Sequence, residues 1–165
     1  MKSPHLLKAA NNVHRLRENL TNVLDAGGLA AIEAEILANV TQLYRLGRGH
    51  FLFAVRQNNR AWRQKVSRLY YAAYNASRAV RLCVNGEYST EIADHKKIEH
   101  LPDDFPRRNT YANQLSVLRE DRNLCDYDHT ADSRDLILSI EDSQSLVTSF
   151  LADARAYLTK RGASL

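Results

Sequence analysis

Acidic residues are absent from a long central part of this chain, residues 36 to 86. The same stretch carries nine basic residues: Arg45, Arg48, Arg56, Arg60, Arg63, Lys65, Arg68, Arg78 and Arg81. From Glu87 to Asp153 the balance reverses, with 15 acidic residues against 7 basic ones. A basic tract of this kind attracts polyanions, nucleic acid first among them, which makes RNA a candidate partner. The alternative is that the basic half packs beside the acidic half and neutralises it.

Glycine, proline and long hydrophobic runs are also scarce. The 165 residues include 6 Gly and 3 Pro, a composition typical of a compact helical protein. A chain of this length forms one domain that buries roughly two-thirds of its unfolded surface. No run of about 18 apolar residues is present, which excludes a transmembrane helix, and the N-terminus has no apolar signal core. We therefore expect a cytoplasmic protein without a membrane partner.

Cysteine is nearly absent, and the common cofactor motifs are missing. Cys83 and Cys125 form no CxxC pair and have no Cys or His neighbours at zinc spacing, so we expect buried, reduced thiols. The sequence contains no P-loop, dinucleotide-binding fingerprint, HExxH motif or nucleophile elbow. We therefore expect neither a metal nor a cofactor.

Apolar side chains that recur at steps of three and four predict an all-α bundle in a single domain, residues 1–165. The expected helices cover residues 5–24, 29–57, 60–84 and 110–127, and a last helix runs from about 130 to 160. Gly47 and Gly49 suggest a kink or break in the second helix, and Asn85-Gly86 forms a C-terminal cap of the third. Asp128 or Thr130 can cap the last helix. One long loop covers about 86–109, with a short helix expected at 95–101.

The segment around Arg122 has the residue types needed to cleave RNA without a metal. Such cleavage needs a base for the ribose 2′-hydroxyl, an acid for the leaving 5′-oxygen and a cation on the phosphate. His129 can transfer protons, Arg122 can hold the phosphate, and Asn123 can donate a hydrogen bond to it.

Spacing limits this scheme, because seven residues of helix advance about 10 Å. Two copies of the segment, facing each other across a symmetric homodimer, would close the gap between Arg122 and His129. The alternative is an ordinary ion-paired ladder, since Asp126 lies four residues after Arg122 and three before His129.

Basic and aromatic residues elsewhere are weaker candidates for RNA binding. Arg68 and Arg78 flank the run Tyr70-Tyr71-Ala72-Ala73-Tyr74, whose rings could stack on unpaired bases, although packing in the core is the favoured interpretation. His95, Lys96 and Lys97 in the long loop could contact phosphate, although a solvated surface is the favoured interpretation.

Several of these segments together resemble the HEPN domain family. Residues 68–79, which begin Arg-Leu-Tyr-Tyr-Ala-Ala-Tyr-Asn, look like the family's central helix, and Asp-His-Lys-Lys at 94–97 resembles the loop after it. Residues 115–127, with Arg122-Asn123 followed by Asp126-Tyr127, resemble the helix that carries the family's signature. The resemblance covers about residues 30–160 and leaves residues 1–28 as an N-terminal helical extension.

The resemblance implies a small helical bundle that dimerises through its signature helices. It also implies a metal-independent endoribonuclease of a toxin–antitoxin or phage-defence system, in which Arg122, Asn123 and His129 form the catalytic set and the products carry a cyclic phosphate. Asp126-Tyr127 matches members without a functional histidine, which are partner-binding or non-catalytic; in this chain we expect these two residues to support the site. The alternative function is therefore a non-catalytic module that binds a nucleotidyltransferase, an antitoxin or another defence partner, or a nucleotide or RNA binder without chemistry.

Overall fold

The described part of the chain, residues 12–89 and 92–165 of a computed structural model, is built from helices and contains no strand. The all-α bundle expected from the sequence is confirmed. Its α-helices are α2 (Val13–Asn19), α3 (Ala26–Arg56), α4 (Trp62–Asn85), α5 (Arg108–Tyr127) and α6 (Ile140–Thr159), with short 3-10 helices η1 (Asn59–Ala61) and η2 (Ile92–Lys97). Within the described ranges, none of these helices combines the length and the apolar character needed to cross a membrane.

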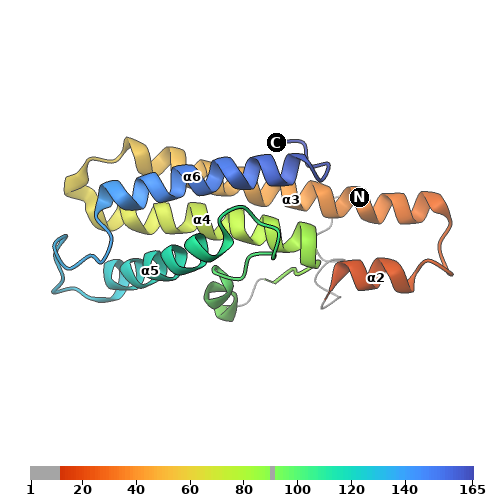
Figure 1. Cartoon of the computed structure of the whole chain (residues 1–165), viewed down its shortest axis with the longest axis horizontal. Coiled ribbons are helices and arrows are strands. Elements are labelled where there is room, and N and C mark those ends of the chain that lie inside the picture. Colours follow the sequence, from red (N-terminus) through yellow and green to blue (C-terminus); the bar gives the residue numbers. More distant parts are fainter. Residues whose placement is uncertain (1–11, 90–91) are drawn as a thin grey trace.

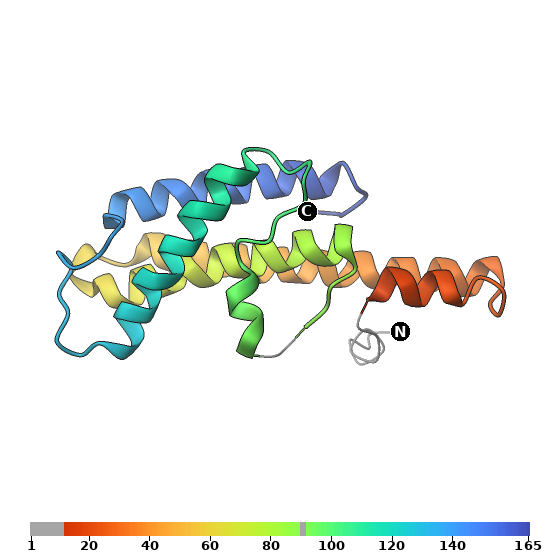
Figure 2. The same ribbon diagram turned by 60° about the horizontal axis from the view of Figure 1, so that its bottom comes forward.

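Helix α4 is the centre of the bundle and packs against α3, α5 and α6 (Figure 1). Figure 2 shows that α5 crosses the other long helices obliquely. Small residues on α4 let α3 approach closely: a Cβ added at Gly47 of α3 would lie 2.7 Å from the carbonyl oxygen of Ala72. The close approach explains a glycine at this buried position.

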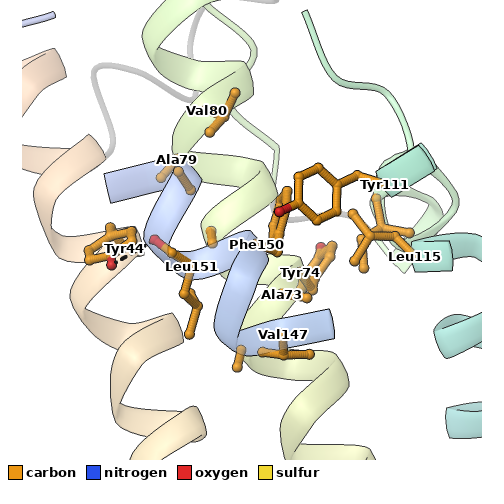
Figure 3. Packing of buried hydrophobic residues seen from close by; sticks show 14 of the residues in the cluster. Tyr44, Ala73, Tyr74, Ala79, Val80, Tyr111, Leu115, Val147, Phe150 and Leu151 are labelled. Carbon is orange, nitrogen blue, oxygen red and sulfur yellow. Dashed lines mark hydrogen bonds between the residues drawn. The ribbon is translucent and has the colours of Figure 1, made fainter. Parts of the chain in front are cut away.

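The core fills the space around α4 with aromatic and aliphatic side chains (Figure 3). Phe150 of α6 is fully buried and packs edge-to-face on Tyr111 of α5, with ring centroids 5.1 Å apart. Tyr44 of α3 donates a hydrogen bond to the carbonyl of Leu151 at 3.0 Å, so its buried hydroxyl is satisfied. These contacts join all four long helices into one core.

The ends of α3 and α4 are set by capping residues. Asp25 caps α3, and its carboxylate accepts a hydrogen bond from the Gly28 amide at 2.7 Å, so the helix begins at Ala26, three residues before the expected start at 29. α3 then continues through Gly47 and Gly49, so a break at these residues, one of the two expected possibilities, is wrong. Gly86 adopts φ 68° after α4, which confirms the predicted cap.

Two other expectations about local structure need correction. The last helix begins at Ile140, with Ser139 as its cap, about ten residues later than expected. The short helix of the long loop is the 3-10 helix Ile92–Lys97, so it begins and ends earlier than the expected 95–101. Of the first expected helix, residues 5–11 lie outside the described part, and α2 covers Val13–Asn19.

α2 lies along the N-terminal part of α3, and together they form an arm that extends beyond the bundle (Figures 1 and 2). No side chain in residues 26–35 of α3 is buried; the first buried one is Ile36. Arg17 and Glu33 form an exposed ion pair across the arm at 3.1 Å. At its base, the Val13 amide donates to the carbonyl of Gly86 at 2.9 Å, which ties the arm to the end of α4.

Candidate functional site

Arg122 lies near the C-terminal end of α5 and faces α4, with 13% of its side chain exposed. Its Nη2 donates a hydrogen bond to the Tyr71 hydroxyl at 2.8 Å, and its Nη1 donates to Asn123 Oδ1 at 3.1 Å. Its Nε lies 2.7 Å from Asp126 Oδ2, which confirms the first half of the predicted ladder. α5 ends at Tyr127, so His129 does not continue that ladder on the same helix.

Three tyrosine rings surround the Arg122 guanidinium. Its central carbon lies 5.6 Å from the Tyr70 ring centroid, 5.5 Å from that of Tyr71 and 5.3 Å from that of Tyr127. Each ring presents a face of partial negative charge, which stabilises a cation and limits its movement. Tyr70 and Tyr74 are buried, so the prediction that this aromatic run packs in the core holds for these two residues. Arg122 is therefore a cation held in one orientation.

A pocket of about 800 Å³ opens beside this arginine. Its lining combines residues of α4, α5 and the long loop: Tyr70, His95, Lys96, Glu99, Arg119, Glu120, Arg122, Asn123 and Tyr127. Three of its residues are cationic and two, Glu99 and Glu120, are acidic; Arg119 pairs with Glu99 at 3.6 Å. The side-chain amide oxygen of Asn123 is occupied by Arg122, so its amide nitrogen is the group left to donate to a ligand.

His95 enters the pocket from η2 and rests on the tyrosines of α4. Its Nδ1 lies 2.7 Å from the Tyr70 hydroxyl, and its ring stacks on Tyr74 with centroids 4.2 Å apart. Burial, and then the positive charge of Arg122, lower the pKa of His95 below its ordinary value of 6.5. The ring is therefore neutral at neutral pH and can accept a proton.

A buried ion pair fixes the loop that carries His95. Both nitrogens of the Arg81 fork donate to the carboxylate of Asp94, at 3.0 and 2.8 Å, and each side chain is 2% exposed. The Tyr74 hydroxyl donates to the same carboxylate at 3.1 Å. These hydrogen bonds hold the pKa of Asp94 below its usual value despite its burial. Sequence reasoning treated His95 as solvated surface and missed this site; an acidic residue directly before the histidine was the only local signal.

The structure places His129 in the exposed segment between α5 and α6, outside the residues that line the pocket. Asp128, expected as a helix cap, instead accepts hydrogen bonds from the amides of Thr130 and Ala131 at 2.9 and 3.2 Å. The far end of the segment is held by Asp121, whose buried carboxylate accepts the amides of Ile137 at 2.7 Å and Leu138 at 3.0 Å.

The four residues expected to guide RNA lie in different surroundings. Lys96 lines the pocket, whereas Lys97 lies 3.9 Å from Glu87. Arg78 donates to the carbonyl of Ser89 at 2.6 Å and lies 3.7 Å from Asp94, so it supports the loop.

Arg68 lies over the exposed Phe53 ring at 5.4 Å and lines a second hollow of about 620 Å³. Tyr71 and Asp126 line this second hollow too, and both contact Arg122. Lining residues of both hollows therefore contact Arg122.

No family model, curated protein or solved structure matches this chain. The chemistry of the site must then follow from its groups. A fixed guanidinium, with Lys96 and Arg119 nearby, suits a phosphate, because charge-assisted hydrogen bonds to phosphate oxygens are strong. A neutral histidine in the same pocket adds a group that can move a proton near neutral pH. Among the described residues, no cluster of three or more His, Cys, Asp or Glu side chains is arranged to hold a metal ion.

Proposed function

We propose that this chain is a HEPN-like RNA-binding protein that cleaves RNA without a metal. One observation carries the proposal: Arg122 is held by three tyrosines at a pocket that also contains Lys96, Arg119 and a histidine. A phosphodiester in this pocket would meet a fixed positive charge where negative charge develops during cleavage. The RNA 2′-hydroxyl would attack the adjacent phosphorus, leaving a cyclic phosphate and a 5′-hydroxyl.

The proposed catalytic set combines Arg122 and Asn123 with His129 as a proton-transfer residue. Arg122 binds the phosphate, and Asn123 orients it through its free amide nitrogen. His129 lies on the segment after α5, so we propose a symmetric homodimer in which two α5 ends face each other and each His129 reaches the partner's pocket. Tyr127 at the end of α5 is 73% exposed, which leaves an aromatic ring available to such an interface.

An RNA-cleaving protein of this size fits a toxin–antitoxin or phage-defence system, with a nucleotidyltransferase or an antitoxin as its partner. A second candidate function is a non-catalytic module that binds such a partner. This candidate is favoured by the existing partners of Arg122, which forms an ion pair with Asp126 and donates a hydrogen bond to Tyr71. Under that interpretation Arg122 and these two partners stabilise the end of α5, and the exposed Tyr127 contacts the partner protein.

The test is an incubation of purified protein with a pool of RNAs in EDTA, followed by analysis of the fragment ends. Arg122→Ala and His129→Ala are compared with Arg134→Ala, a matched control whose side chain is 89% exposed in the same segment as His129. We expect cyclic-phosphate ends from the wild type and from Arg134→Ala. Each of the two site variants should lose cleavage while keeping its helical circular dichroism.

Light scattering on the same samples measures the oligomeric state. A monomer at micromolar concentration would contradict the composite site, and cleavage that stops in EDTA would contradict the metal-free mechanism. A folded dimer that cleaves no RNA and captures a nucleotidyltransferase would support the second candidate.

A further inference from the structure

His95 occupies the pocket in a way that a solvated loop histidine would not. Its Nδ1 is engaged by the buried Tyr70 hydroxyl at 2.7 Å, and its ring is stacked on Tyr74. In the part of the chain that the structure describes, its other nitrogen, Nε2, has no hydrogen-bond partner. One ring nitrogen is therefore fixed by the protein, and the other is left for a ligand.

The surroundings of His95 hold its ring in place. Tyr74 stacks on the ring and donates its hydroxyl to Asp94, the residue directly before His95. Asp94 is in turn held by both nitrogens of the Arg81 fork. A side chain held by a stacked ring, by a hydrogen bond at Nδ1 and through its own backbone loses little entropy on binding, which is the condition for an efficient catalytic group.

Tyr70 holds Nδ1 of His95, which leaves Nε2 as the nitrogen that faces a ligand. Burial raises the pKa of Tyr70 well above 10, so its hydroxyl stays protonated and can accept a hydrogen bond as well as donate one. When Nδ1 carries the ring hydrogen and donates it to the Tyr70 oxygen, Nε2 has a free lone pair. The same hydrogen bond then remains in place when Nε2 takes up a proton, and it stabilises the imidazolium that forms.

We propose that His95 is the general base that deprotonates the ribose 2′-hydroxyl at the phosphate bound by Arg122. This inference rests on the proposed ribonuclease function and assigns the base within it. The bond between the 2′-oxygen and phosphorus forms, the bond between phosphorus and the 5′-oxygen breaks, and the 2′-hydroxyl proton moves to His95 Nε2. The departing 5′-oxygen takes a proton from an acid, a role that suits His129, and solvent restores both histidines.

The test separates cleavage from binding. Single-turnover cleavage is measured with an RNA that the wild type cuts, and binding with the same sequence carrying 2′-O-methyl groups, which cannot be cut. His95→Gln is compared with His100→Ala, a control that removes an exposed histidine of the same loop outside the pocket.

We expect His95→Gln to slow cleavage by at least about 100-fold, the usual contribution of a general base, with 2′-O-methyl RNA binding within threefold of the wild type. His100→Ala should cleave normally. His95→Gln that cleaves within threefold of the wild type would overturn the assignment while leaving the ribonuclease function intact. A wild type that cuts no RNA would overturn the function and the assignment together.

A second variant covers the case in which glutamine disturbs the loop. His95→Ala leaves space for a free imidazole molecule, so added imidazole should restore part of the lost cleavage if the ring acts as a base. Loss of cleavage without rescue, in a variant that still binds 2′-O-methyl RNA, would assign His95 a positioning role and overturn the proposal.

Discussion

Replacing Gly47 by alanine should weaken the contact between α3 and α4. The added Cβ would lie 2.7 Å from the Ala72 carbonyl oxygen and 3.3 Å from the Ala76 amide nitrogen, and both atoms belong to the backbone of a buried helix. Neither can rotate away, so one helix must shift, and overpacking of this kind costs about 1–3 kcal/mol. Alanine gains about 1 kcal/mol over glycine in a helix interior. With a cost near the top of that range, Gly47→Ala should lose about 2 kcal/mol of the free energy of unfolding.

Gly49 is the matched control, because it lies on the same helix and a Cβ there would meet nothing within 4 Å. Gly49→Ala gains the same helix propensity without the clash and should be more stable than the wild type by about 1 kcal/mol. The difference between the two variants, about 3 kcal/mol, isolates the packing cost. Urea unfolding followed by far-UV circular dichroism at one protein concentration measures it. Equal stabilities, within about 0.5 kcal/mol by urea extrapolation, would refute the close approach of α3 to α4.

Two further predictions concern the charges around the pocket. Asp126→Asn should raise the affinity for 2′-O-methyl RNA up to about fivefold, because it frees Arg122 from an ion pair worth up to about 1 kcal/mol. Fluorescence anisotropy measures this affinity. Weaker binding by the variant would mean that Asp126 holds Arg122 in its binding position. Asp94→Asn should destabilise the bundle by up to about 3–5 kcal/mol in urea unfolding, because the buried Arg81 loses one of its two carboxylate partners and keeps only the more exposed Glu87, 3.2 Å away. The pKa of Asp94 is lowered in the folded state, so its contribution is present above the unfolded value near 4 and is lost as the pH falls through the lowered pKa. The stability of Asp94→Asn should consequently fall less steeply than that of the wild type below about pH 4, and parallel curves would contradict this account.

The long helices could be predicted because their signals are local. α4 combines a regular apolar pattern with Asn85-Gly86 at its end, and the predicted range differs from the observed one by two residues or fewer. The start of α6 could not be predicted in this way. Leu136, Ile137 and Leu138 continue an apolar pattern, but the carboxylate of Asp121 captures two of their amides from 16 and 17 residues away. A contact between distant residues thus overrides the local preference for helix.

The same distinction applies to the site. Arg122, Asn123 and Asp126 could be identified together because they are neighbours on one helix, and the Arg122–Asp126 ion pair follows from their spacing. His95 reaches the pocket through contacts to Tyr70 and Tyr74 of α4, and through the pairing of Asp94 with Arg81. None of these contacts produces a periodic pattern in the sequence. The catalytic role of His129 stays a prediction.

α3 is one continuous helix, but its first part, which lies in the arm beside α2, should be less stable than the rest. Residues 26–35 have no buried side chain, whereas the rest of α3 packs in the bundle. Amide hydrogens in residues 26–35 should therefore exchange with solvent through fraying of the arm, and those around Val40 and Tyr44 only through opening of the core. Hydrogen exchange would divide α3 near Ile36, at a point where its backbone shows no interruption. Residues 26–35 can consequently unfold and refold many times while the rest of the bundle stays intact.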